Sequence, residues 1–379
     1  MLKKLAQRAT ILMSVNNHIS NMPMKTNTLV NAETQVSEMP VRIQQLKLGV
    51  DWHADHFRVV RMCDGQSPQP AQRFTPDSFL PFVEKQLTLA DQVFVVYEAG
   101  PGGFHLHRQL TALGVTAFVV HPQKLDPQHK GVVTDKTDAR ELVLNLDRFL
   151  RGNLRAMSVV RVPTPAEEQR RALSRQREQL RRERQRLAAQ GRSLCLTQGI
   201  RLRGEWWKAK LTLPDWLEQR LAIWRQLIQA VEALLEALTK QVEALAPKER
   251  PKGLGPLTLG MLIAELCDWS RFKNRKQIGS YTGLCGGVSS SGQSHCDLSI
   301  TKAGNARVRW SLIELAWRMV LYQPQSKAVQ RWKHVLLNPK AAARQKKRAL
   351  VALARQLAVD LWRWQTGKIT PEQLGWVMV

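Results

Sequence analysis

Cysteine is scarce and scattered in this 379-residue chain. The five cysteines are odd in number and none falls in a CxxC pair, so the sequence predicts neither a disulfide framework nor a zinc site. Long apolar runs are missing too, since no stretch approaches the about 20 apolar residues of a membrane-spanning helix. Residues 1–15 are unlike a secretory signal, because Arg8 interrupts their apolar part and no small-residue cleavage site follows. We therefore expect a protein of the reducing cytoplasm with no membrane partner.

Acidic residues balance the basic ones in only one part of the chain. Residues 47–150 carry 11 Lys/Arg and 12 Asp/Glu, whereas residues 151–379 carry 41 and 17. The formal net charge of +26 therefore lies almost entirely in the second part. This division is typical of a protein in which one part performs metal chemistry while the other binds a polyanion, for which nucleic acid is the usual candidate.

Composition and periodicity divide the chain into four segments. Residues 1–44 are polar, poor in aromatics and without sustained periodicity, which predicts a disordered leader. In residues 45–152, short β-rich runs alternate with helical ones, which predicts an α/β domain with a mixed sheet. Residues 153–249 indicate a helical coiled-coil domain, and residues 250–379 a mainly α C-terminal domain.

Four acids occupy the ends of predicted elements in the α/β domain. Asp51 ends the first strand, Glu98 ends the strand VFVVYE, and Asp135 and Asp138 share one face of a helix's first turn. Carboxylates gathered at one edge of a sheet repel each other unless divalent cations neutralise them, and such oxygen-rich sites suit Mg²⁺ or Mn²⁺. Each acid alone has a simpler explanation, because strand ends often carry acids and the helix dipole favours Asp in a first turn.

The middle of the chain carries two apolar seams. Leucines recur every seven residues in the arginine-rich segment 167–194, and apolar residues alternate four and three apart in residues 214–247. This spacing predicts a coiled coil and a homo-oligomer, a dimer or a tetramer. Whether the two segments fold back on each other or pair between subunits stays open, as does whether the arginines follow a nucleic-acid backbone or form a solvated face.

A serine-rich stretch in the C-terminal domain allows two interpretations. Residues 286–292 read GGVSSSG, and a basic segment follows at residues 302–309. The stretch is either a flexible linker or a loop that presents a hydroxyl to a phosphate, with the glycines permitting close approach of the backbone. Upstream, the glycine-rich turn of residues 252–260 leads into an apolar helix, whose N-terminal amides could receive a phosphate.

Three N-terminal stretches carry a family resemblance. They are LGVDWHADHF, VVYEAGPGGFHLHRQLTALG and TDKTDARELV, and they resemble the DEDD-type insertion-sequence transposases that have a RuvC-like N-terminal domain. The resemblance implies an RNase H-like fold in which Asp51, Glu98, Asp135 and Asp138 form the metal-binding tetrad, with Mg²⁺ or Mn²⁺ as the cofactor. Two positions where the family commonly has lysine hold Ala54 and Val133, which puts substrate contacts in doubt but leaves the acids in place.

The C-terminal domain resembles the serine-containing transposase domain of the same family. The shared positions include Arg271-Phe272, Tyr281–Leu284, Ser291-Gly292 and the run from Lys302 to Arg309. The resemblance implies that Ser291 is the nucleophile, with Ser290 as the alternative because a one-residue alignment slip exchanges them. Lys302, Arg307 and Arg309 are the expected nucleic-acid contacts, since they could neutralise the attacked phosphate.

The resemblance implies a transposase that cuts and rejoins DNA through a covalent phosphoserine intermediate. Members of the family are guided by a structured non-coding bridge RNA, so donor DNA, target DNA and a guide RNA are the expected partners. Two other hypotheses stay open. One is a metal-dependent Holliday-junction resolvase or nuclease that uses water and has structural serines, and the other is an inert nucleic-acid-binding protein.

Overall fold

The computed structural model describes residues 42–100, 102–121, 135–291 and 294–379. They form two compact units that divide between Val159 and Val160. Nearly all of the predicted leader, residues 1–44, lies outside the described residues, and so does Val133. Within the described part of the chain, no helix is both long and apolar enough to span a bilayer.

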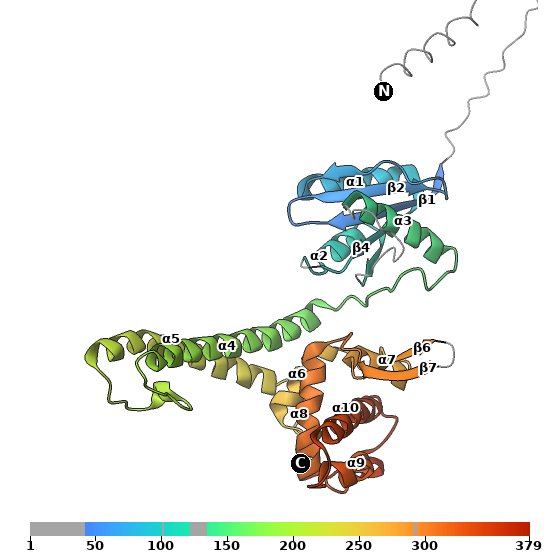
Figure 1. Ribbon diagram of the computed structural model, residues 1–379. Coiled ribbons are helices and arrows are strands. Elements are labelled where there is room, and N and C mark those ends of the chain that lie inside the picture. Colours follow the sequence, from blue (N-terminus) through green and yellow to red (C-terminus); the bar gives the residue numbers. More distant parts are fainter. Residues whose placement is uncertain (1–41, 101, 122–134, 292–293) are drawn as a thin grey trace, which may run out of the picture. The chain divides into compact units, whose positions relative to one another are not determined.

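The N-terminal unit is built on a five-stranded mixed sheet of order β3-β2-β1-β4-β5 (Figure 1). The strands are β1 (Ile43–Trp52), β2 (Phe57–Cys63), β3 (Gln72–Phe74), β4 (Ala90–Glu98) and β5 (Thr116–Val120). The helices are α1 (Pro76–Leu89), α2 (His105–Ala112) and α3 (Asp135–Leu150). Strand β1 is antiparallel to β2 and parallel to β4, and β5 is parallel to β4. The predicted α/β domain with a mixed sheet is confirmed.

Alternation along β1 assigns its two faces. Leu46, Leu48 and Val50 are fully buried on one face, the face on which Phe57 of β2 contacts Phe79 of α1. The intervening residues face α3 instead. A Cβ placed on Gly49 would lie 2.2 Å from the carbonyl oxygen of Ala139, so α3 packs directly on the strand backbone.

A buried ion pair fixes the direction of α3 across β1. Lys47 Nζ lies 2.8 Å from Asp147 Oδ1, and both side chains are buried. Burial opposes ionisation of Asp147, but hydrogen bonds and charge from Lys47 and Arg151 outweigh it and lower the pKa of this carboxyl. Because Asp147 pairs with Lys47 while Ala139 covers Gly49, α3 runs opposite to β1, and its first turn lies toward Asp51.

The second unit begins with a helical hairpin, α4 (Pro165–Leu196) and α5 (Asp215–Glu243). The helices are antiparallel, since Arg177 Nε donates to Thr239 Oγ1 at 2.8 Å and Arg184 Nη1 to Glu232 Oε1 at 3.2 Å. Their seam buries Leu187, Ala188, Cys195, Leu217, Leu221 and Ile228. The two apolar segments therefore fold back on each other within one chain. The turn Trp206–Lys208 caps this hairpin, because both of its tryptophans are buried.

The rest of the second unit is mainly helical, as predicted, with one β-hairpin. Its elements are α6 (Pro256–Leu266), α7 (Arg275–Thr282), β6 (Gly286–Ser291), β7 (Ser294–Ile300), α8 (Ala306–Tyr322), α9 (Lys327–Leu336), α10 (Ala343–Gln365) and α11 (Pro371–Leu374). Residues 377–379 return to residues 250–252, where Arg250 N donates to Val379 O at 3.1 Å and Val379 N to Arg250 O at 2.9 Å. This backbone pairing closes the unit.

Candidate active site

Asp51 and Glu98 lie side by side on neighbouring strands. The parallel register of β1 and β4 pairs Val50 with Tyr97, so the next residue of each strand is one of the two acids. Both acids point to the α3 side of the sheet, because Asp51 follows Gly49 by two residues and Glu98 follows Val96 by two. Sequence reasoning placed both acids at strand ends, and the structure places them at adjacent ends on one face.

Asp138 lies on the helix that covers this face. It precedes Ala139, whose carbonyl oxygen lies over Gly49, two residues before Asp51. Asp135 is the first residue of α3, in the same turn, although its side chain is outside the described residues. The three described acids of the predicted tetrad therefore share one face and one end of the sheet.

The donor chemistry at this edge fits a hard divalent cation, because Asp51 and Glu98 are adjacent, α3 brings two further aspartates to the same end of the sheet, and such oxygen ligands suit Mg²⁺. Within the described ranges, which omit the Asp135 side chain, no three His, Cys, Asp or Glu side chains come close enough together to hold a metal ion. Asp51, Glu98, Asp138 and Asp135 are the residues that would complete such a site.

A histidine that sequence reasoning missed contacts Asp51. His53 Nε2 lies 3.2 Å from Asp51 Oδ2, and the ring stacks on His56 with centroids 5.0 Å apart. The spacing of two residues after Asp51 could have indicated this, since alternation gives both side chains the same face. Trp52 points to the other face, where it meets the ring of His105 at 5.2 Å. The Asp51 carboxylate thus has an imidazole nitrogen within hydrogen-bond distance.

The serine-rich stretch forms a strand. Ser291 is the last residue of β6 and pairs with Ser294, the first residue of β7, so it sits beside the turn of an antiparallel hairpin. The side chains of Ser290 and Ser291 lie outside the described atoms, and the choice between the two stays a prediction. Ser291 belongs to the second unit and the acids to the first.

The motif that surrounds the serines forms the root of this hairpin. Lys302 N donates to Gly283 O at 3.1 Å, and Asn305 N donates to Tyr281 O at 2.8 Å, which joins the two ends of the hairpin. Gly304 has φ +142°, and a Cβ placed there would lie 2.4 Å from Tyr281 O. Only glycine allows this approach, so the shared motif has a structural reason.

Two of the predicted nucleic-acid contacts make structural bonds. Arg309 Nη1 donates to the carbonyl oxygens of Thr282 and Lys302, each at 3.1 Å. Arg307 Nε lies 2.6 Å from Glu178 Oε2 of α4. Burial raises the pKa of Glu178, but the hydrogen bond and charge of Arg307 outweigh it, so this pKa lies below its ordinary value. Lys302 is exposed and has φ +56°. A role of these residues toward DNA stays a prediction.

A buried carboxylate links the hairpin root to α4, and sequence reasoning missed it. Glu265 of α6 accepts from Arg175 Nε at 3.1 Å and from Asn305 Nδ2 at 2.9 Å, and Tyr281 Oη donates to the Glu265 carbonyl at 3.1 Å. These four residues come from α4, α6, α7 and the start of α8, up to 130 positions apart in the chain. No local pattern could have indicated the contact.

One family model and several known proteins match this chain in sequence. The model of the "Transposase IS116/IS110/IS902 family" matches residues 249–331. A Sinorhizobium fredii (strain NBRC 101917 / NGR234) protein, "Putative transposase y4rJ", is 32% identical over 311 residues, which cover 73% of this chain and 78% of the relative. "Putative transposase y4qE" of the same strain is 28% identical, with coverage of 73% and 77%.

A third relative comes from another genus. The "Transposase for insertion sequence element IS1111A" of Coxiella burnetii (strain RSA 493 / Nine Mile phase I) is 26% identical over 294 residues, which cover 73% of this chain and 78% of the relative. Because each relative covers 73% of the chain, these matches extend well beyond residues 249–331. It belongs to the IS116/IS110/IS902 family of transposases.

Proposed function

We propose that this chain moves an insertion sequence by cutting and rejoining DNA, with Ser291 as the nucleophile and Asp51, Glu98, Asp135 and Asp138 as metal ligands on an RNase H-like domain. The observation that carries the proposal is the placement of Asp51 and Glu98 at neighbouring strand ends, with α3 bringing its first turn, which bears Asp135 and Asp138, toward the same end of the sheet. The strand order β3-β2-β1-β4-β5, with only the first two pairings antiparallel, supports the RNase H-like assignment.

The chemistry assigned to Ser291 is a transesterification. Its Oγ forms a bond to the phosphorus while one backbone P–O bond of the DNA breaks, so the number of phosphodiester bonds is conserved. The serine proton passes to solvent or to a nearby base, and the released sugar oxygen takes up a proton. Mg²⁺, when bound, would stabilise the charge that develops on the phosphate oxygens. The rigid root at Gly283 and Gly304 would hold the hairpin in position for this attack.

A trapped adduct tests the nucleophile. Full-length protein incubated with donor DNA and Mg²⁺ is expected to give a protein–DNA species that survives SDS. Ser291→Ala should abolish it and Ser290→Ala should retain it, the latter serving as a matched control one residue away. If cleavage depends on Mg²⁺ but no variant or parent forms an adduct, water is the nucleophile and the resolvase hypothesis replaces this one.

We also propose a structured guide RNA as a partner. The family resemblance implies it, and the excess of Lys and Arg in residues 151–379 supports it, because sequence-independent affinity for nucleic acid comes mainly from phosphate contacts. Sequencing the nucleic acid that co-purifies with the protein tests this proposal. Recovery of one discrete non-coding RNA is expected, and a random mixture of cellular RNA would contradict it.

A second face of α5 supports oligomerisation through the coiled-coil region. Trp216, Ile223, Leu227 and Leu234 are spaced seven, four and seven apart and are 48–57% exposed, although α4 already covers the opposite seam. Leu227→Glu is expected to shift the sedimentation coefficient to that of a monomer, whereas Gln229→Glu, off this stripe, should not. A monomeric parent would contradict the proposal.

A further inference from the structure

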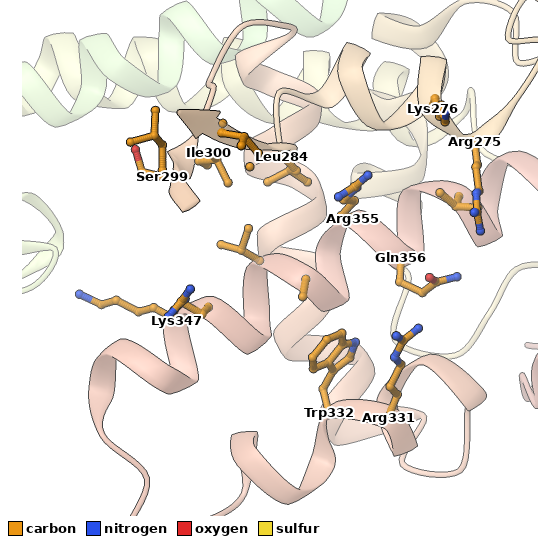
Figure 2. A pocket seen from close by; sticks show the side chains of 18 of the residues that line it. Arg275, Lys276, Leu284, Ser299, Ile300, Arg331, Trp332, Lys347, Arg355 and Gln356 are labelled. Carbon is orange, nitrogen blue, oxygen red and sulfur yellow. The ribbon is translucent and has the colours of Figure 1, made fainter. Parts of the chain in front are cut away.

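The second unit contains a large pocket beneath the β6–β7 hairpin. It encloses about 1280 Å³, more than the about 300–1,000 Å³ of sites for drug-sized ligands, and α7, the hairpin, α9 and α10 form its walls. Figure 2 shows the side chains gathered around α10, with Leu284 and Ile300 above it and Trp332 and Arg331 below it in the view. One face of α10 lines the pocket, while its opposite face fills the core.

The pocket is strongly cationic. Nine Lys or Arg side chains line it and no Asp or Glu does; they are Lys273, Arg275, Lys276, Arg331, Arg344, Lys347, Arg348, Arg355 and Arg363. In the part of the chain that the structure describes, none of these nine is within salt-bridge distance of a carboxylate. Like charges gathered with few counter-charges repel each other, so this arrangement favours a bound polyanion.

The arginines of α4 differ from those of the pocket. Arg175 pairs with Glu265, Arg184 with Glu232 and Arg186 with Glu183. These three arginines each have a carboxylate partner within the protein, which none of the nine cations of the pocket has in the described residues.

The pocket also exposes apolar surface, which the phosphate groups of a nucleic acid would not contact. Val288 and Leu298 project from the hairpin and are more than half exposed, and Trp332 of α9 lies on the opposite wall. Arg331 stacks near that indole, its guanidinium carbon 5.3 Å from the ring centroid. Cations interleaved with an aromatic ring and aliphatic side chains are typical of sites that bind unpaired bases by their faces while holding the phosphates.

We propose that this pocket binds unpaired DNA nucleotides that adjoin the phosphate attacked by Ser291. The proposal rests on the proposed function of Ser291. Val288 lies three residues from Ser291 along β6, which is about 10 Å in an extended strand. Unpaired nucleotides that directly adjoin the attacked phosphate would therefore lie within reach of the pocket wall. A paired duplex would present phosphates and base edges, and its stacked base faces could not reach the apolar wall.

Binding assays on the full chain test the pocket. Protein carrying Ser291→Ala is titrated, without Mg²⁺, into three fluorescent probes, and binding is followed by anisotropy. The probes are a 12-nucleotide DNA single strand, its duplex and an RNA of the same sequence. The double variant Lys347→Ala/Arg355→Ala is expected to bind the DNA single strand at least ten-fold more weakly. Its slope of log Kd against log salt should fall by about 1.4, since each lost phosphate contact on a single strand contributes about 0.7.

Matched variants separate the pocket from general charge. Arg203→Ala/Lys210→Ala removes two equally exposed cations from the α4–α5 connection and should leave the affinity within two-fold. Trp332→Leu should weaken single-strand binding about ten-fold without changing the salt slope, because it removes stacking and no charge. Val288→Ser, which removes exposed apolar surface and no charge from the same pocket, gives the same information if Trp332→Leu lowers the melting temperature.

Several outcomes would overturn the proposal. If the pocket variants lose equal affinity for the duplex and the single strand, the pocket is a general phosphate-binding surface. If they lose affinity only for RNA, the pocket binds RNA. If the control variant Arg203→Ala/Lys210→Ala binds as weakly as the pocket variants, the pocket has no specific role. The adduct assay keeps the two proposals distinct. An SDS-stable adduct together with unchanged affinity in the pocket variants refutes the pocket alone, whereas lost affinity without any adduct in the parent refutes Ser291.

Discussion

Replacing Gly49 by alanine should impair DNA cleavage although it alters no acid. The new Cβ would lie 2.2 Å from Ala139 O and 2.7 Å from Val143 N, whereas ordinary contacts of this kind begin at 3.4 Å. Helix α3 must therefore retreat by about 1.2 Å, because both clashing atoms are backbone. That movement carries Asp135 and Asp138 away from Asp51. We expect the overpacking to cost about 1–3 kcal/mol of stability, and the displacement of the acids to slow adduct formation about 100-fold.

The assay is the rate of SDS-stable adduct formation per folded molecule, with the folded fraction taken from urea unfolding followed by circular dichroism. Gly100→Ala is the matched control, since its Cβ would meet only Glu98 O at 3.9 Å although it lies two residues from that acid. It should behave like the parent. If Gly49→Ala retains the parental rate and stability, the packing of α3 on Gly49 does not set the position of the acids.

Three further predictions follow from other contacts. Lys47→Met should lower the free energy of unfolding by about 1–3 kcal/mol in urea titrations, because Asp147 keeps a buried charge that only the more exposed Arg151 still pairs with, whereas Lys47→Met combined with Asp147→Leu should recover most of the loss. The hydrogen bond from Arg161 lowers the pKa of Glu167 from 4.5 to about 2, so as the pH falls the unfolded state binds the proton before the folded state does. The free energy of unfolding should therefore decrease as the pH falls from 4.5 to about 2, and Glu167→Gln should make this decrease smaller. The same pH profile in parent and variant would refute this prediction. Gly304→Ala should abolish the adduct while far-ultraviolet dichroism stays parental, because it displaces only the hairpin root; a normal adduct would contradict that role.

Local patterns predicted much of the N-terminal unit. Buried runs ending in Asp51 and Glu98 indicated strands, and both acids lie at strand ends. The pairing of these two strands could not be predicted, because register depends on contacts between residues far apart in the chain. The same limit applies to Gly49, which has no local pattern to show that a helix about 90 residues later packs on it.

The second unit was less accessible to sequence reasoning. The a/d spacing predicted both long helices, yet not that they fold back within one chain. The stretch GGVSSSG lacks the alternation of a strand, and its hairpin is defined by the root at Tyr281 and Asn305 instead. The pocket combines residues 273–363 from several elements, so no local pattern could indicate it. The tetrad and Ser291 stay predictions.

The closure of the second unit by residues 377–379 has a consequence for synthesis on the ribosome. The first unit is complete at Val159, but the pairing with residues 250–252 must wait until Val379 has been made. At about 5–20 residues per second, roughly 10–40 s separate the two events. In a nascent chain the acid-bearing first unit would thus fold well before the serine-bearing second unit. Under the proposed mechanism, DNA cleavage therefore cannot begin until residues 377–379 have been synthesised and have paired with residues 250–252.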